Sequence, residues 1–296
     1  MVEQAYQPLR PVRFEFIDIR GLRHRVALWG PESATPIVLL HGFMDCSLTF
    51  QFLVDQLPAD WSFAAPDWRG FGGTESTGTS YWFPDYLADL EVLLDRLTSA
   101  APACVIGHSM GGNIASLYAG IRPDRLRWLV NLEGFGLRSM AADAVPARYG
   151  EWLDQLRAKR TERHFESPQQ LAAVLARRNP RLTLARAQFI AEAWTRPVAG
   201  GYELATDPMH RLLNPVIYRR DEAEACWQRM TCPMLLLLGE QSEYLPHLGA
   251  DGTAARFRQI YQRLTLTTLP GVGHMLHHED PAAVAATIVH FQSEQA

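Results

Sequence analysis

A serine flanked by glycines follows a short apolar run at residues 104–113, which read CVIGHSMGGN. Gly107 and Gly111 lie two positions before and two positions after Ser109, so the segment fits the pattern G-x-S-x-G. Between a strand and a helix, this pattern is typical of a nucleophile elbow, a strained turn in which only small residues fit beside the serine. The pattern predicts that Ser109 is a nucleophile rather than a surface serine in a glycine-rich turn.

A serine hydroxyl needs a neighbouring base, which is itself oriented by a carboxylate. The last predicted strand runs into VGHMLHHEDP at residues 272–281. His274 follows that strand directly, so we expect its imidazole to reach Ser109. His277 and His278 compete for this role, but they fall close to the final helix and are expected to make local hydrogen bonds. A metal site built on them has little support, because the sequence shows no second ligand cluster nearby.

The oxyanion of an acyl-transfer intermediate requires backbone N–H donors. We expect one donor to be the N–H of Met110, at the start of the helix that follows the serine, where the helix dipole also favours negative charge. The second donor is expected to be the N–H of Phe43. His41 and Gly42 immediately before it form a tight turn at the exit of a predicted strand.

The segments between these residues read as alternating strands and helices, which predicts a mostly parallel sheet with helices on both faces. Arg20-Gly21 joins the first two strands as a tight hairpin. Helical patterns cover residues 85–97 and 113–120, and the final helix is expected to begin at Pro281 with Asp280 as its N-cap. The eight predicted strands are Arg13–Ile19, His24–Trp29, Ile37–Leu40, Ser62–Ala65, Ala103–Ile106, Leu126–Leu132, Met234–Leu238 and Leu264–Leu269.

The alternation breaks in residues 135–229, which show no convincing strand and contain many aromatic residues and prolines. We interpret this stretch as a cap of about four short helices on the carboxyl edge of the sheet, where α/β proteins bind ligands. It divides the core into residues 1–134 and 230–296. Residues 136–230 contain 14 Arg and one Lys against 11 Asp and Glu. Solvated helix faces explain this excess better than an anionic substrate does.

Composition excludes several function classes. The 296 residues are 47% hydrophobic and 20% charged, as in ordinary globular proteins. A net charge of -4 without a basic block argues against a nucleic-acid partner. The longest aliphatic run, MLLLL at 234–238, is too short to span a membrane, and the N-terminal segment lacks the apolar region of a signal peptide. Four cysteines without a C-x-x-C pair are expected to be reduced thiols, which predicts a cytoplasmic location.

The sequence resembles the α/β-hydrolase family, in its serine hydrolase branch with a helical cap. The resemblance implies an α/β-hydrolase fold and a serine-dependent hydrolase with Ser109 as nucleophile, His274 as base, and Phe43 and Met110 as oxyanion donors. It also implies that the segment from Asp67 to Arg69 is structural. The segments that match the family, in its order, are HGFM at 41–44, PDWRGFGGTES at 66–76, GHSMGG at 107–112 and GHMLHHEDP at 273–281.

The catalytic acid departs from the family pattern. Relatives usually carry an aspartate three residues after the glycine that ends the seventh strand, and here that position is Ser242. Glu243, one residue later, is the first choice for the acid. Glu133 is the alternative, because it follows the sixth strand at a sharp exit, where an unpaired carboxylate would be costly. The sequence leaves both glutamates open, while Glu240 lies too near the strand end.

These residues predict an enzyme of the hydrolase class that cleaves a small ester through an acyl-enzyme on Ser109. A hydrolase of carbon–carbon bonds in ring-fission products shares the same constellation and is the alternative, followed by a ligand-binding protein that retains the triad. The expected partner is a small-molecule substrate, and the sequence does not indicate an oligomeric state. Neither a metal nor a cofactor is expected, since Gly70-Phe71-Gly72-Gly73 lacks the strand-before, helix-after context of a nucleotide site.

Overall fold

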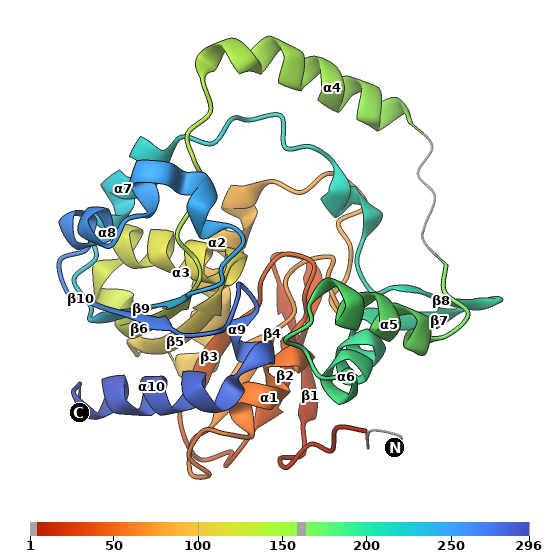
Figure 1. Cartoon of the computed structure of the whole chain (residues 1–296), viewed down its shortest axis with the longest axis horizontal. Helices are drawn as coiled ribbons and strands as arrows, with labels where there is room; N and C mark the ends of the chain where they lie inside the picture. Colours follow the sequence, from red (N-terminus) through yellow and green to blue (C-terminus); the bar gives the residue numbers. More distant parts are fainter. Residues whose placement is uncertain (1–4, 100, 159–163, 296) are drawn as a thin grey trace.

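An eight-stranded sheet with helices on both faces forms the centre of the molecule (Figure 1). The computed structural model describes residues 5–99, 101–158 and 164–295. The strand order is β1-β2-β4-β3-β5-β6-β9-β10. The predicted fold class, a mostly parallel α/β sheet, is confirmed. The strands are β1 (Arg13–Ile19), β2 (Leu22–Trp29), β3 (Ile37–Leu40), β4 (Phe63–Pro66), β5 (Ala103–His108), β6 (Leu126–Leu132), β9 (Met234–Gly239) and β10 (Leu264–Leu269).

Strand β2 pairs antiparallel with both β1 and β4, whereas the other pairs of this sheet are parallel. Ile19 pairs with Leu22, so Arg20 and Gly21 form a two-residue hairpin loop. Their φ values of 49° and 81° suit a type I′ turn, which needs positive φ at both central residues. The parallel strands end at one edge, and this edge collects the residues singled out by the sequence.

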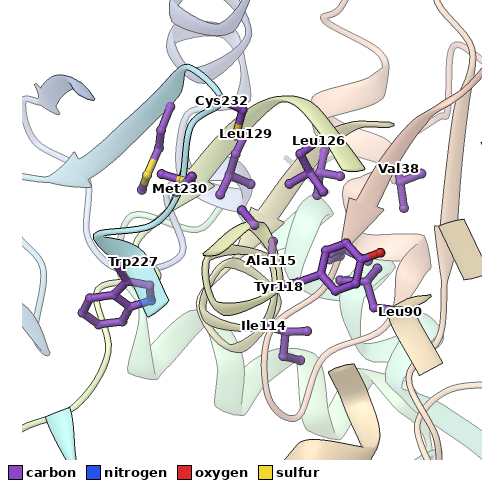
Figure 2. Packing of buried hydrophobic residues seen from close by; sticks show 14 of the residues in the cluster. Val38, Leu90, Ile114, Ala115, Tyr118, Leu126, Leu129, Trp227, Met230 and Cys232 are labelled. Carbon is purple, nitrogen blue, oxygen red and sulfur yellow. The ribbon is translucent and has the colours of Figure 1, made fainter. Parts of the chain in front are cut away.

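Helices cover the two faces of this sheet in separate apolar layers. On one face, α2, α3, α7 and α8 enclose a core of aliphatic and aromatic side chains. Figure 2 shows side chains of these helices and of the sheet meeting in this layer, among them Leu90, Ile114, Tyr118 and Trp227. On the other face, α1, α9 and α10 pack against a second layer. The helices are α1 (Gln51–Val54), α2 (Phe83–Thr98), α3 (Met110–Ile121), α4 (Val145–Arg157), α5 (Pro168–Arg178), α6 (Leu184–Trp194), α7 (Arg220–Trp227), α8 (Ala254–Ile260), α9 (Leu276–Glu279) and α10 (Pro281–Ser293).

Helix α10 begins as its sequence indicates. The carboxylate of Asp280 accepts a hydrogen bond from the N–H of Ala283 at 3.0 Å, and Pro281 is the first helical residue. Asp280 therefore caps an otherwise unpaired amide of the first turn, which confirms its predicted role. This cap fixes where the loop after β10 ends, and that loop contains His274.

In its described residues, the stretch between β6 and β9 contains four α-helices and one unpredicted hairpin. Strands β7 (Thr195–Val198) and β8 (Gly201–Leu204) pair antiparallel, which corrects the expectation of helices alone. Pro197 is unfavourable in a strand and each strand has only four residues, so no alternating pattern is visible. Helices α5 and α6 share an apolar cluster of their own, whereas Trp227 of α7 belongs to the core beside α3. The division into core and cap segments stays a prediction.

Two expectations from composition concern membranes and disulfides. Within residues 5–99, 101–158 and 164–295, no helix is both long and apolar enough to cross a bilayer. All four cysteines lie in these ranges, and each is a free thiol. Burial raises the pKa of the Cys104 and Cys232 thiols to about 11, so both stay protonated at neutral pH. These two thiols are core residues rather than reactive groups.

Candidate active site

Ser109 lies in a strained turn between β5 and α3. Its φ of 49° and ψ of -112° fall outside the regions that non-glycine residues favour. The N–H of Ser109 donates to the carbonyl of Leu132 at 2.8 Å, which holds the turn against the end of β6. A Cβ at Gly107 would lie 2.7 Å from the backbone of Gly111, and one at Gly111 would lie 2.1 Å from the Leu40 carbonyl oxygen. Backbone contacts therefore exclude side chains at both flanking positions.

The imidazole of His274 lies between Ser109 and a buried carboxylate. Its Nε2 is 3.0 Å from Ser109 Oγ, and its Nδ1 is 3.1 Å from Glu133 Oε2. With the proton on Nδ1, the ring donates to the carboxylate and accepts from the serine hydroxyl. Ser109, His274 and Glu133 thus form a continuous hydrogen-bonded chain from three separate strand ends.

Glu133 is held in place from the end of β9. Its side chain is fully buried, and its φ of 60° turns the chain sharply out of β6. One carboxylate oxygen accepts from the N–H of Gly239 at 2.8 Å, and the other accepts from the hydroxyl of Ser242. Ser242, at the position where relatives usually have the acid, therefore binds the acid instead. These bonds compensate the cost of burying the carboxylate.

Glu243, the first choice for the acid, lies beside the loop and does not contact the His274 ring. Its carboxylate accepts from the backbone N–H of His274 at 3.2 Å and pairs with Arg181 at 2.7 Å, and its side chain is 56% exposed. Partial burial would raise the pKa of Glu243, but backbone hydrogen bonds and Arg181 outweigh it and lower the pKa below its usual value. The expected contact with the imidazole is corrected from Glu243 to Glu133.

Asn131 supports this acid and is missed by the motif analysis. Its side-chain amide donates to the Gly134 carbonyl at 2.7 Å and to the Ser116 hydroxyl at 2.9 Å, while its oxygen accepts from the Gly134 N–H at 2.6 Å. These bonds clamp the turn that contains Glu133 onto helix α3. An asparagine within the apolar strand LVNL is the sequence signal that could have identified it.

The two predicted oxyanion donors flank Ser109. Met110 is the first residue of α3, where an N–H has no intrahelical acceptor. A Cβ on Gly42 would lie 3.2 Å from Ser109 Cβ, so the Gly42–Phe43 backbone runs directly against the serine. Phe43 is 52% exposed, and its ring lies 6.0 Å from that of Phe71. That the N–H groups of Met110 and Phe43 receive an oxyanion stays a prediction.

His41 fixes the turn that precedes Phe43. Its Nε2 accepts from the N–H of Trp68 at 2.9 Å, and its Nδ1 donates to the Gly42 carbonyl at 2.8 Å. The Trp68 indole N–H donates to the His41 carbonyl at 3.1 Å. Burial lowers the pKa of His41 to about 4, which keeps the ring in the neutral form that these contacts need.

Asp67 and Arg69 tie the neighbouring loops together, as the family resemblance implies. The Asp67 carboxylate accepts from the N–H groups of Ser47 and Gly73 at 2.7 and 2.9 Å. Arg69 forms two 2.6 Å hydrogen bonds with Asp89. None of these contacts involves Ser109, so both residues act on the loops at this edge rather than on the reacting atoms.

A buried polar cluster lies beneath the site. Polar atoms of Asp45, His108 and His277 lie within 4.8 Å of one another, a group that could hold a metal ion. His108 Nε2 donates to the His274 carbonyl at 3.0 Å, and the ring nitrogens of His277 have no hydrogen-bond partner within the described ranges. His277 therefore lacks the local bonds expected of it, and its neighbours come from distant loops. The sequence predicts that no metal is bound, and for this cluster that stays a prediction.

Burial sets the protonation of this cluster. It lowers the pKa of His108 and His277 well below the usual histidine value, with neighbouring histidines adding to the effect. Burial raises the pKa of Asp45 to about 6, although hydrogen bonds from Thr49 and Trp194 oppose the shift. Asp45 lies in the loop after β3, His108 at the end of β5 and His277 after β10, so the cluster brings three segments together with its imidazoles in the neutral form.

Comparison with known proteins agrees with this geometry. Residues 35–281 match the family model described as alpha/beta hydrolase fold. The chain belongs to the α/β-hydrolase fold family. A serine hydrolase-like protein from Danio rerio is 29% identical over 283 residues, which cover 92% of this chain and 85% of the relative. A 2-(acetamidomethylene)succinate hydrolase from Mesorhizobium japonicum is 27% identical over 263 residues, covering 88% and 89%.

Solved structures of this α/β-hydrolase fold superpose over nearly the whole chain. A thioesterase domain from the curacin biosynthetic pathway gives a TM-score of 0.82 at 22% identity and covers 95% of this chain and 99% of that domain. At this identity the likeness shows the fold. The family resemblance is confirmed, and the protein is a serine hydrolase of α/β fold.

Proposed function

We propose that this hydrolase cleaves carboxylic esters through an acyl-enzyme on Ser109. The observation that carries the proposal is the chain of contacts from Ser109 Oγ to His274 Nε2 at 3.0 Å and from His274 Nδ1 to Glu133 at 3.1 Å. These distances allow a proton to move between the serine hydroxyl and the imidazole. A hydroxyl, an imidazole and a carboxylate in this order form the arrangement that activates a serine for attack on a carbonyl carbon.

In the first half-reaction, Ser109 Oγ bonds to the ester carbonyl carbon as its proton passes to His274 Nε2. The carbonyl oxygen becomes an oxyanion and accepts hydrogen bonds from the N–H groups of Met110 and Phe43. His274 then gives its proton to the leaving alkoxide as the ester C–O bond breaks. The products are the free alcohol and an acyl group bonded to Ser109.

In the second half-reaction, water attacks the acyl carbon as His274 accepts its proton. The bond to Ser109 Oγ breaks, the proton returns to the serine, and the carboxylic acid leaves. Throughout both steps the Glu133 carboxylate stabilises the transient imidazolium and holds the ring in one orientation. Its bonds to Gly239 and Ser242 fix it in advance, so the site needs no rearrangement when charge develops.

Labelling and turnover test this proposal together. A fluorophosphonate is expected to label the wild-type protein but not Ser109→Ala, and 4-nitrophenyl acetate is expected to give a burst of 4-nitrophenol that the same substitution abolishes. Absence of both labelling and turnover of any short ester or thioester would refute the proposal.

The alternatives give different results in the same assays. Decay of a dienone-type ring-fission product without ester turnover would identify a carbon–carbon bond hydrolase. Tight small-molecule binding without measurable turnover would identify a ligand-binding protein. A cytoplasmic location remains part of the proposal, supported by the four free thiols, and fractionation of the source cells tests it.

A further inference from the structure

A pocket of about 250 Å³ with mostly apolar walls lies near Phe43, whose ring is 6.2 Å from the ring of the lining residue His210. Its walls come from the loop before α2, from α4 and from the segment between β8 and α7. This volume is large enough for a single ring, because an apolar cavity of about 150 Å³ already holds benzene. The apolar side chains that line it are Trp82, Trp152, Met209, Leu212, Leu213 and Val216.

The pocket walls are uncharged. Among the described residues that line it, there is no Asp, Glu, Lys or Arg. The two titratable lining groups are His210, which donates from Nε2 to the Arg69 carbonyl at 3.0 Å, and Tyr81, which donates to Asp207 at 2.7 Å. Burial lowers the pKa of His210 to about 4 and raises the pKa of Tyr81, so both are neutral near pH 7.

Ring contacts relate the pocket to the segment beside the nucleophile. The Phe43 ring lies 6.2 Å from the His210 ring, and Phe71 stacks on His210 at 3.8 Å, centroid to centroid. The residue before Phe43, Gly42, abuts Ser109. A substrate with its carbonyl at Ser109 could therefore extend past Phe43 toward the pocket.

Three arginines of the stretch between β6 and β9 are paired within the protein. Arg181 pairs with Glu243 and Glu279, and Arg186 donates to the carbonyls of His278 and Glu279. Arg220, which is buried, pairs with Glu224. These three side chains are thus occupied by acidic groups and backbone oxygens of the protein itself, and Arg148 of α4 donates to the carbonyl of the lining residue Asn214 at 2.6 Å.

Helix α4 adds to the apolar surface beside the pocket. Tyr149, Trp152, Leu153 and Leu156 follow the i, i+3, i+4, i+7 spacing, so they share one face. Tyr149, Leu153 and Leu156 are exposed, and Trp152 reaches the pocket. In Figure 1 α4 lies apart from the sheet and its covering helices. An exposed apolar stripe beside a pocket without charged lining residues suits an apolar ligand.

We infer that this pocket binds an uncharged apolar group of the substrate, either an alkyl chain of several carbons or a single ring. The inference rests on the proposed function for its ester chemistry and on the pocket for its selectivity. It distinguishes this protein from a hydrolase of anionic substrates, because none of the described side chains that line the pocket offers a carboxylate a positive charge in return for its lost hydration.

Three 4-nitrophenyl esters test the substrate class: the acetate, the pentanoate and the hydrogen glutarate, whose five-carbon acyl group ends in a carboxylate. We expect kcat/KM for the pentanoate to exceed that of each of the other two by about tenfold or more, since one methylene in an apolar pocket already changes it by about tenfold or more. Equal values for acetate and pentanoate, or a preference for the glutarate, would overturn the inference.

Substitutions in the pocket wall test whether the pocket causes the preference for the pentanoate. Trp152→Ala and Leu213→Ala are each expected to lower the pentanoate-to-acetate ratio of kcat/KM by about fivefold or more, in line with the removal of several methylenes from a pocket wall. Leu184→Ala is the matched control, since Leu184 is an exposed apolar residue of the cap outside the pocket, and both rates are expected to stay unchanged. An unchanged ratio in both pocket variants, with wild-type circular dichroism, would contradict the assignment.

Binding to Ser109→Ala separates the pocket from the chemistry. Ethyl pentanoate is expected to change tryptophan fluorescence saturably in this variant, and the change is expected to fall sharply in Ser109→Ala/Trp152→Ala. If wild-type Ser109 reacts with fluorophosphonate but ethyl pentanoate causes no change, the pocket inference is wrong and the proposed function stands. If Ser109 does not react but ethyl pentanoate binds, the function is wrong and the pocket stands.

Discussion

The elbow around Ser109 and helix α4 differ in how far packing fixes each residue. A methyl group at Gly111 would lie 2.1 Å from the Leu40 carbonyl oxygen, whereas one at Gly150 in α4 would meet no heavy atom within 4 Å. No residue of α4, all of which the structure describes, is buried. Backbone contacts therefore fix the geometry of the elbow, whereas folding leaves the side chains of α4 free to vary. This difference explains how one fold can keep its chemistry and change its substrates.

The same contrast applies to charge. Both oxygens of the Glu133 carboxylate have hydrogen-bond partners, which come from the end of the neighbouring strand β9, from the loop after it and from the loop after β10. The described residues that line the pocket near Phe43 include no Asp, Glu, Lys or Arg. Substitutions in either region test this contrast.

The largest effect is expected from the acid. Glu133→Gln should lower kcat by about 10³- to 10⁴-fold, because the amide can no longer stabilise the imidazolium and favours the wrong tautomer of His274. Glu243→Gln is the matched control, and its kcat should fall by less than about tenfold, since Glu243 meets only the backbone of His274. Steady-state rates with one ester decide the matter, and a larger loss in Glu243→Gln would reverse the assignment.

A substitution at the elbow should lower the unfolding free energy strongly. Gly111→Ala places a Cβ against two backbone carbonyls, those of Leu40 and His41, which belong to β3 and its exit. Overpacking of this kind costs about 3 kcal/mol of unfolding free energy or more, because backbone atoms cannot rotate away. Urea unfolding measures the loss. A variant with wild-type stability would show that the strand and helix are less closely packed than described.

Acid should destabilise the fold through its buried histidines. Burial lowers the pKa of His41 and His210 from 6.5 to about 4, so between these values the unfolded chain binds protons that the folded chain does not. The unfolding free energy therefore falls as the pH drops from 6.5 to 4, by on the order of 3 kcal/mol for each group. Asp45, with its raised pKa of about 6, opposes the trend between pH 6 and 3.8, but it is one group.

Unfolding by urea at pH 7.0 and pH 5.0 tests this expectation, and the midpoint should be lower at pH 5.0. His210→Gln should reduce the difference between the two midpoints, whereas His290→Gln should not, because the His290 side chain is 77% exposed. Equal midpoints for the wild-type protein at both pH values would show that these imidazoles are not held neutral by the fold.

The sequence predicted the parts of this molecule that depend on local pattern. The bounds of β1, β3, β6 and β10 agree with the predicted strands. The apolar runs of β3 and β6 and the alternating side chains of β1 and β10 are strand signals that the local sequence carries by itself. Ser109 and His274 follow from spacing relative to strand ends, since parallel strands all end at one edge. The contact of their side chains agrees with that reasoning, although the catalytic role remains proposed.

The parts that the sequence left open depend on contacts between distant segments. Choosing between Glu133 and Glu243 requires knowing that the Ser242 hydroxyl turns toward β6 and that Asn131 clamps the turn after it. The meeting of Asp45 with His277 joins loops more than 200 residues apart, which no local pattern records. The hairpin β7–β8 was missed because four-residue strands are too short to show alternation.

The smallest predicted effect returns to α4 and has the opposite sign. Gly150→Ala should raise the unfolding free energy by about 0.5–1 kcal/mol, because alanine is favoured over glycine inside a helix and the new methyl group meets no other atom. Urea unfolding of Gly150→Ala and Gly111→Ala in one experiment compares the expected gain in unfolding free energy with the expected loss. Since α4 lies outside the sheet core, the gain appears only if the helix unfolds together with the rest of the chain. A change of helix content in circular dichroism without a shift of the midpoint would show that α4 unfolds separately. The stability of α4 would then be independent of the stability of the sheet that carries Ser109.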